Sequence, residues 1–188
     1  MNLVLASRSP QRRAILTQLG VPFTTRVADV EELAEGPPLE VALENAFRKA
    51  SAVERGPGET ILGVDTLVSL GRRIYGKPVD EAEARATLRA LAGHRHEVVS
   101  GVCAIGPDGT PRTAAARTAV TFRSFGEPLV DWYMAAGEWR ERAGGYAIQG
   151  RGAALVERIE GDYFNVVGLP VVAVLDLLPQ LLGESPKP

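Results

Sequence analysis

The chain has 188 residues, of which 45% are hydrophobic, and its formal net charge is −2. This length suits one α/β domain with a core large enough to fold without a disulfide or a structural metal. The small net charge excludes a chain that is basic throughout and binds nucleic acid polymers non-specifically. The single cysteine, Cys103, excludes an internal disulfide and favours a reducing compartment such as the cytoplasm.

No segment of the sequence predicts a membrane span or a secretory leader. The N-terminal apolar run ends after a few residues, where arginines begin. The apolar run from Leu169 to Leu182 is interrupted by Asp176 and Pro179, so it predicts a packing helix. We expect a single domain over residues 1–182, with two lobes around a cleft, and a frayed tail over residues 183–188.

Hydrophobic periodicity and turn residues predict strands and helices that alternate in the first half, with locally paired strands in the second half. The predicted strands cover residues 2–6, 23–28, 60–69, 72–75, 96–105, 113–123 and 153–159, and a short segment follows at 163–167. The predicted helices cover residues 10–19, 38–54, 81–91, 127–136 and 170–182, and a glycine-rich loop covers 144–152. This mixture predicts an α/β fold with a mixed central sheet flanked by helices.

The start of the first predicted helix carries an unusual charge pattern. Ser9 is a good N-cap and Pro10 a good first helical residue. Arginines nevertheless gather there, at positions 8, 12 and 13, although a helix N-terminus favours acidic groups. The pattern predicts either an anion site, with a phosphate held by backbone N–H groups and guanidinium groups, or simply exposed arginines.

A buried carboxylate is the strongest chemical signal in the chain. Asp65 lies in the middle of a strand that is apolar on both faces, between Val64 and Thr66. An unpaired carboxylate there would cost several kcal/mol, so Asp65 must face a cation, a metal, a strong donor or a cleft. Gly63 would allow another backbone or a ligand to approach closely. A functional carboxylate is favoured over a structural partner of a buried arginine.

Several other residues are candidates for binding a charged ligand. Glu31 and Glu32 form either a solvated acidic face or, together with Asp65, a divalent-ion site. Lys49 and Lys77 are kept as lysines in a chain that uses arginine for nearly every other cation, and lysine is a compact charge suited to a phosphate oxygen.

The glycine-rich loop and the two histidines are less specific signals. Gln149 lies among glycines, and its amide could both donate to and accept from a nucleobase. His94 and His96 would share one face of a strand, but no third metal ligand is near them in the sequence. We therefore interpret the histidines as structural.

Five segments together resemble the Maf family, in the family's order and over about residues 3 to 178. These segments are Leu5-Ala-Ser-Arg-Ser-Pro-Gln-Arg-Arg, Gly63-Val-Asp-Thr-Leu-Val, Gly76-Lys-Pro-Val-Asp, Ala143-Gly-Gly-Tyr-Ala-Ile-Gln-Gly and Gly161-Asp-Tyr-Phe-Asn-Val-Val-Gly-Leu-Pro. The resemblance implies a fold similar to that of the inosine triphosphatases. It also implies an enzyme that splits a nucleoside triphosphate into the monophosphate and pyrophosphate with a divalent cation, Mg²⁺ or Mn²⁺.

The resemblance also implies roles for individual residues. Asp65 resembles the family's proton acceptor, and Glu32 and Asp65 are expected to face the metal. The residues expected to bind the substrate or set its specificity are Ser7, Gln11, Arg12, Lys49, Thr66, Lys77 and Gln149. Thr66 and Gln149 match the group that acts on dTTP and UTP, whereas Gln11 matches neither that group nor the group that acts on 7-methyl-GTP.

The implied function is therefore hydrolysis of dTTP and UTP, with roles in cleaning the nucleotide pool and in arrest of cell division at septum formation. Two alternatives stay open: a nucleotide-binding regulator of septation without turnover, and a purine-directed pyrophosphatase acting on ITP or XTP. The partners expected are a nucleoside triphosphate and a second copy of the chain in a homodimer. No nucleic acid polymer and no membrane insertion are expected, and the expected location is the cytoplasm.

Overall fold

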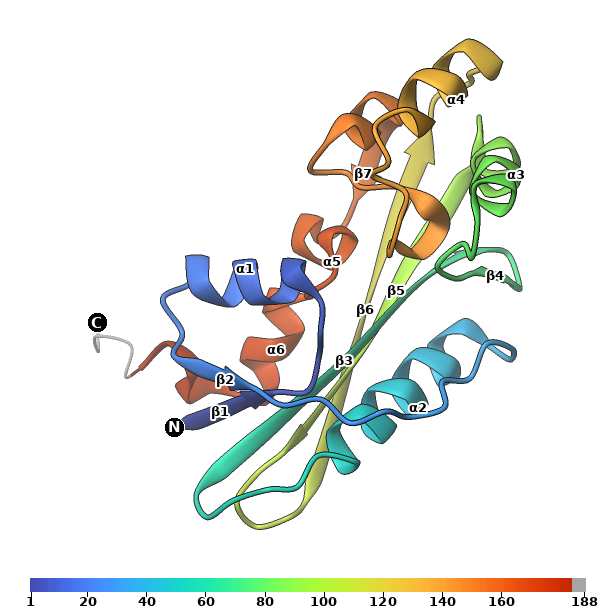
Figure 1. Cartoon of the computed structure of the whole chain (residues 1–188). Coiled ribbons are helices and arrows are strands. Elements are labelled where there is room, and N and C mark those ends of the chain that lie inside the picture. The colour runs from blue at the N-terminus through green and yellow to red at the C-terminus, as the bar shows by residue number, and fades with distance from the viewer. Residues whose placement is uncertain (184–188) are drawn as a thin grey trace.

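The computed structural model describes residues 1–183 and shows a twisted sheet with helices packed against both faces (Figure 1). The seven strands are β1 (Asn2–Leu5), β2 (Phe23–Thr25), β3 (Glu59–Leu70), β4 (Arg73–Tyr75), β5 (Arg95–Ile105), β6 (Pro111–Phe122) and β7 (Val156–Glu160). The α-helices are α1 (Pro10–Gln18), α2 (Pro38–Ser51), α3 (Glu81–Leu91), α4 (Glu127–Met134), α5 (Tyr163–Val167) and α6 (Val171–Leu177). Three short 3-10 helices are η1 (Ala143–Gly145), η2 (Arg151–Leu155) and η3 (Pro179–Leu182). The predicted α/β class with a mixed sheet is confirmed.

The strand order is β2-β1-β3-β5-β6-β7, and β4 pairs separately with β3. β1 runs parallel to both of its neighbours, and the other pairs are antiparallel. β1 pairs with β3 only as far as Leu62, and β4 pairs with β3 only from Val68 onward. Residues 63–67 of β3 therefore have β5 on one edge and, in the described part of the chain, no strand on the other.

Several predicted boundaries differ from those of the structure. The strand expected over 23–28 ends at Thr25, because β1, the strand with which β2 pairs, ends at Leu5. The helix expected over 170–182 is divided into α6 and η3, since Pro179 has no N–H to continue it. The glycine-rich stretch contains η1 and η2, and β7 begins only at Val156. The expected tail lies outside the described residues from residue 184 onward.

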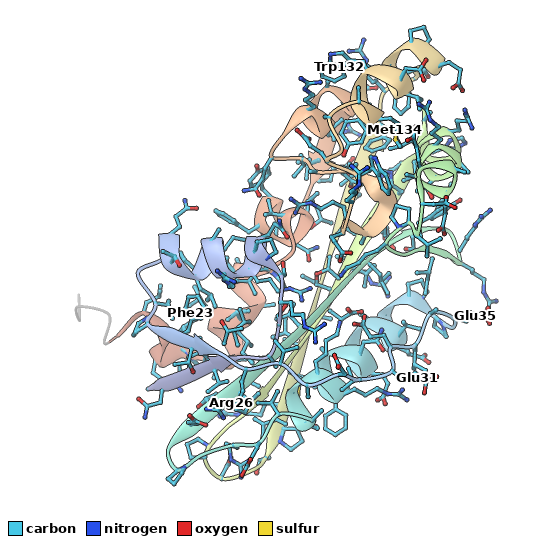
Figure 2. All side chains as sticks on the ribbon, viewed as in Figure 1. Phe23, Arg26, Glu31, Glu35, Trp132 and Met134 are labelled. Carbon is cyan, nitrogen blue, oxygen red and sulfur yellow. The ribbon has the colours of Figure 1, made fainter. Side chains whose placement is uncertain are left out.

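The two faces of the long strands have separate apolar clusters. Leu62 and Val64 of β3 pack with α1 and α6, whereas Ile61 and Cys103 pack with α2. Burial raises the pKa of the Cys103 thiol to about 11, so this side chain stays a protonated, structural thiol. A third cluster surrounds α3 and α4 at the far end of β5 and β6 (Figure 1). Figure 2 places Trp132 and Met134 at that end and Phe23 at the other.

Helix α2 lies unusually close to the sheet. Its buried face carries Ala42, Ala46 and Ala50, which recur every four residues along the helix. A Cβ atom on Gly63 of β3 would lie 2.2 Å from the Ala46 carbonyl oxygen, and one on Gly101 of β5 would lie 2.2 Å from that of Ala42. Only glycine at both positions allows the helix backbone to rest against the strands.

The substitution Gly101→Ala is expected to destabilise the fold by about 1–3 kcal/mol, because α2 must move away from β5 to make room for the methyl group. The free energy of unfolding from urea titrations measures this change. Gly76→Ala is the matched control, since a Cβ there meets nothing within 4 Å. Equal stability of the two variants would contradict the tight contact between α2 and the sheet.

His96 lies in the far cluster rather than in a metal site. It is 1% exposed, and its Nε2 lies 3.0 Å from the Tyr146 hydroxyl. Its ring meets Phe122 edge to face at a centroid distance of 4.7 Å. Burial lowers the pKa of His96 to about 4, whereas His94 is exposed. The structural interpretation of the histidines therefore fits their different surroundings.

The lowered pKa of His96 predicts an acid-sensitive stability. Between about pH 4 and 6.5 the unfolded chain binds a proton at His96 that the folded chain excludes. This linkage contributes stability that is complete above that interval and lost as the pH falls through it, by up to about 3 kcal/mol. The free energy of unfolding, measured from pH 7 to 4, should fall less steeply with decreasing pH for His96→Gln than for the wild type. For His94→Gln it should fall as steeply as for the wild type. Identical slopes in all three proteins would contradict the prediction.

Candidate active site

Asp65 is held on the face of β3 that α2 covers. It is 7% exposed. Lys49 donates to Oδ1 at 2.6 Å, and the Asn45 amide donates to Oδ2 at 3.2 Å. Lys49 also lies 2.9 Å from a carboxylate oxygen of Glu32. One ammonium group therefore joins both acids that the sequence identified as metal-facing.

Thr66, the next residue, points to the opposite face of β3. Its hydroxyl lies 2.9 Å from the Ser100 hydroxyl and accepts from an Arg12 guanidinium nitrogen at 3.2 Å. Arg12 also donates to the Ser7 hydroxyl at 2.9 Å and, through Nε, to the Gly168 carbonyl at 2.9 Å. Adjacent residues of one strand thus engage two different polar networks, because strand side chains alternate between faces.

Arg12 is a buried cation that no carboxylate touches among the described residues. It is 8% exposed, and its hydrogen-bond acceptors are two hydroxyl groups and one carbonyl. Burial lowers the pKa of Arg12, and the nearby charges of Asp65 and Glu32 oppose that effect. A buried guanidinium without a bonded counter-ion favours an anionic ligand beside it.

Only one of the three arginines predicted to gather at the start of α1 is buried at the site. Ser9 caps α1 by accepting from the backbone N–H of Arg12 at 3.4 Å, and Gln11 accepts from the Ser9 hydroxyl at 3.0 Å. Arg8 lines the cavity described next but pairs with Asp29 in an exposed ion pair. Arg13 is exposed and does not line that cavity. Arg12 alone of the three arginines is buried at the site.

A single cavity of about 950 Å³ joins these groups. The nine residues to which the resemblance assigns a role all line it: Ser7, Gln11, Arg12, Glu32, Lys49, Asp65, Thr66, Lys77 and Gln149. Glu31, the other acidic candidate, does not line it. Charged groups, including those around Asp65, form part of its lining. Apolar side chains also contribute, among them Val68, Val98 and Ile148. The cavity therefore offers both cationic groups for a polyphosphate and apolar surface for a flat base.

The wall of the cavity that carries Gln149 and Lys77 is tied together by a backbone hydrogen bond and by the buried Tyr133. The Gly144 N–H donates to the Gly76 carbonyl at 3.0 Å, which joins the loop of Gln149 to the loop of Lys77. The Ala147 N–H donates to the Tyr133 hydroxyl at 3.1 Å. Lys77 itself forms an exposed ion pair with Glu141 at 3.1 Å. Gln149 is thus carried by a loop whose backbone is fixed on two sides.

Sequence reasoning missed two hydrogen-bond partners at the site. Asn45 shares a helix face with Lys49, and this spacing of four residues was the available signal for its contact with Asp65. Ser100 gave no sequence signal, because its contact with Thr66 depends on the pairing of β3 with β5.

The donor set fits a divalent cation bound together with phosphate. Glu32 and Asp65 approach one point closely enough to share the Lys49 ammonium. Mg²⁺ is commonly held by one or two carboxylates and completed by substrate phosphates and water. Within residues 1–183, no group of three or more His, Cys, Asp or Glu side chains gathers as an all-protein metal site.

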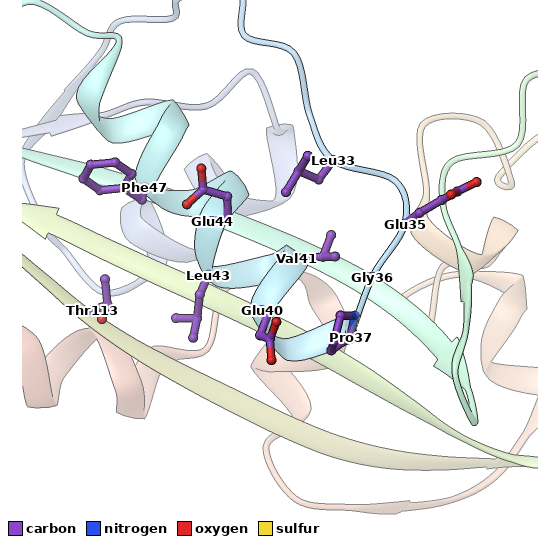
Figure 3. A pocket seen from close by; sticks show the side chains of 10 residues that line it. All are labelled: Leu33, Glu35, Gly36, Pro37, Glu40, Val41, Leu43, Glu44, Phe47 and Thr113. Atoms are coloured by element: carbon purple, nitrogen blue, oxygen red, sulfur yellow. The ribbon is translucent and has the colours of Figure 1, made fainter.

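A second, shallower pocket of about 580 Å³ lies along α2 (Figure 3). Phe47 and Leu33 line it, and its charged residues are Glu35, Glu40 and Glu44. This acidic lining is unsuited to a triphosphate, so the larger cavity is the candidate active site. Among the described residues, no helix has the length and apolar character needed to cross a membrane.

Comparison with known proteins identifies the family of the chain. The family described as Maf-like protein matches residues 2–181. The chain is 44% identical to a protein of Pyrococcus furiosus named dTTP/UTP pyrophosphatase, covering 98% of this chain and 97% of that protein. It is 46% identical to a protein of the same name from Deinococcus radiodurans, covering 94% and 91%.

Among solved structures, the Ham1 protein of Staphylococcus aureus matches with a TM-score of 0.44 and 17% identity, covering 65% of this chain and 72% of that one. The family match and the identities carry the assignment. The protein described here belongs to the Maf family.

Proposed function

We propose that this protein is a nucleoside triphosphate pyrophosphatase that hydrolyses dTTP and UTP to the monophosphate and pyrophosphate. The observation that carries this proposal is the convergence of a buried carboxylate, a buried arginine and two lysines on one cavity. The names of the relatives in Pyrococcus furiosus and Deinococcus radiodurans support the same reaction and the same bases.

In this proposal Asp65 is the general base. It accepts a proton from a water molecule whose oxygen attacks the α-phosphorus. The bond between that phosphorus and the oxygen bridging to the β-phosphorus breaks, and its electron pair leaves with pyrophosphate. Asp65 Oδ1 and Oδ2 each accept one bond from the protein, and a carboxylate has further lone pairs for the water.

The cations position the triphosphate and offset its charge, which is the main requirement of phosphoryl chemistry. Arg12 lines the cavity and is oriented by Ser7, Thr66 and the Gly168 carbonyl. Lys49 and Lys77 approach from α2 and from the loop after β4. Glu32 and Asp65 would hold Mg²⁺ or Mn²⁺, which supplies further charge neutralisation when bound.

The base is proposed to lie toward Gln149, where apolar side chains line the cavity. A side-chain amide matches a uracil or thymine edge, which offers both a donor and acceptors. Three further properties follow from family membership and stay predictions: a homodimer, a cytoplasmic location and a role in division arrest.

Pyrophosphate release from a panel of nucleoside triphosphates, with Mg²⁺ or Mn²⁺, tests the proposal. We expect UTP and dTTP to be the best substrates. Release from ITP or XTP alone would indicate a purine-directed enzyme, and no release from any nucleotide would indicate a binding regulator.

Asp65→Asn is expected to lower kcat by about 10²–10⁴-fold, the usual contribution of a general base. The change is nearly isosteric, and Lys49 keeps Glu32 as an ionic partner. Circular dichroism should therefore show an unchanged fold. Asp131→Asn, at an exposed position on α4, is the matched control and should retain full turnover. Turnover of Asp65→Asn at the wild-type rate would exclude Asp65 as the base.

Gln149→Glu is expected to lower kcat/KM for UTP and dTTP by about tenfold or more, because a carboxylate replaces the donor half of the amide and leaves a base acceptor unpaired. The metal concentration for half-maximal rate should change far less. Gln18→Glu, exposed on α1, controls for the added charge. An equal loss for every base would show that Gln149 does not recognise the base.

A further inference from the structure

The ladder of β3 is interrupted beside the catalytic carboxylate. Pairing with β1 ends at Leu62, and pairing with β4 starts at Val68. Residues between these positions keep β5 on their other edge, where Asp65 lies opposite Gly101 and Leu67 opposite Val99. The interruption coincides with the candidate site, since Asp65, Thr66 and Leu67 all line the cavity.

Strand geometry determines which backbone groups face this open edge. The Leu62 carbonyl accepts from the Ala6 N–H at 2.9 Å, so the backbone groups of Leu62 point toward β1. Successive residues of a strand direct their N–H and C=O groups to opposite edges. Val64 and Thr66 therefore present their backbone groups to the open edge, and Asp65 and Leu67 present theirs to β5.

Thr66 is the residue of this pair that a ligand can reach. Val64 is 0% exposed and does not line the cavity, whereas Thr66 is partly exposed and does. The Thr66 side chain is turned away toward Arg12 and Ser100. Within residues 1–183, no strand pairs with its backbone N–H and C=O on this edge, and the residue lines the cavity next to the proposed general base.

We propose that the backbone N–H of Thr66 donates a hydrogen bond to an α-phosphoryl oxygen of the substrate. This inference rests on the proposed function. A fixed N–H beside the attacked phosphorus stabilises charge there without having to reorganise. The Thr66 carbonyl on the same edge needs a donor, and the sugar hydroxyls of a nucleotide supply one. The open edge of β3 therefore binds the segment that joins sugar and phosphate.

Three features support a nucleotide phosphate as the occupant of this edge. A guanidinium nitrogen of Arg12 lies 3.2 Å from the Thr66 hydroxyl, so a cation contacts the same residue that carries the backbone N–H. Asp65, one residue earlier, is bonded to Lys49 at 2.6 Å, which leaves cations on both faces of the strand. The Thr66 N–H pairs with no other backbone group of the described residues, so it is available to donate to a bound anion.

Amide hydrogen exchange, measured by NMR on the whole protein, tests the proposal. In the free protein the Thr66 N–H should exchange about 100-fold faster than that of Leu67, which pairs with β5. Saturation with the non-cleavable α,β-methylene analogue of UTP, or with UMP, should slow exchange at Thr66 by about tenfold or more. Neither pyrophosphate nor uridine should slow it, because both lack the α-phosphoryl group. Leu67 is the internal control throughout.

Two results would overturn the inference. One is a Thr66 amide that is already as protected as that of Leu67 in the free protein. The other is an effect of ligands that does not follow the α-phosphoryl group: exchange at Thr66 is slowed by neither UMP nor the analogue, or it is slowed as much by pyrophosphate or uridine as by those two. These results are separable from the proposed function, since pyrophosphate release by the wild type decides the latter independently.

Discussion

The close packing of α2 on the sheet is the constraint on which the site depends. Gly63 and Gly101 let the helix backbone rest against β3 and β5, where any Cβ would collide with it. The same contact brings Lys49 to 2.6 Å from Asp65. A helix held farther out would leave the mid-strand carboxylate without its cation, and burial of Asp65 would then be costly. Fold stability and site geometry therefore share one interface.

The site separates its charges across the two faces of β3. On the α2 face, Lys49 joins Asp65 to Glu32, so opposite charges are paired before any ligand arrives. On the other face, Arg12 is bonded only to neutral groups among the described residues. The first network holds the residues proposed to bind the metal and to act as the base, and the second holds the arginine proposed to bind the phosphates. A metal-bound polyphosphate complements both.

Sequence patterns predicted the fold class, the family and the residues that line the cavity, and the fold class and family are confirmed. They succeeded where a local rule applies, as with the cap at Ser9 and the buried mid-strand Asp65. They failed where the outcome depends on a distant partner. The length of β2 is limited by the end of β1, and the contact of Ser100 with Thr66 requires the register between β3 and β5.

The bond between the Gly144 N–H and the Gly76 carbonyl makes the loops of Gln149 and Lys77 a single mechanical unit. If Gln149 and Lys77 have the proposed roles, a nucleotide that fits poorly at Gln149 would also displace the lysine that binds its phosphates. The identity of the base would then affect the rate of turnover as well as the affinity of the cavity for the nucleotide. One backbone hydrogen bond between neighbouring loops would thereby convert recognition of a base into control of the reaction rate.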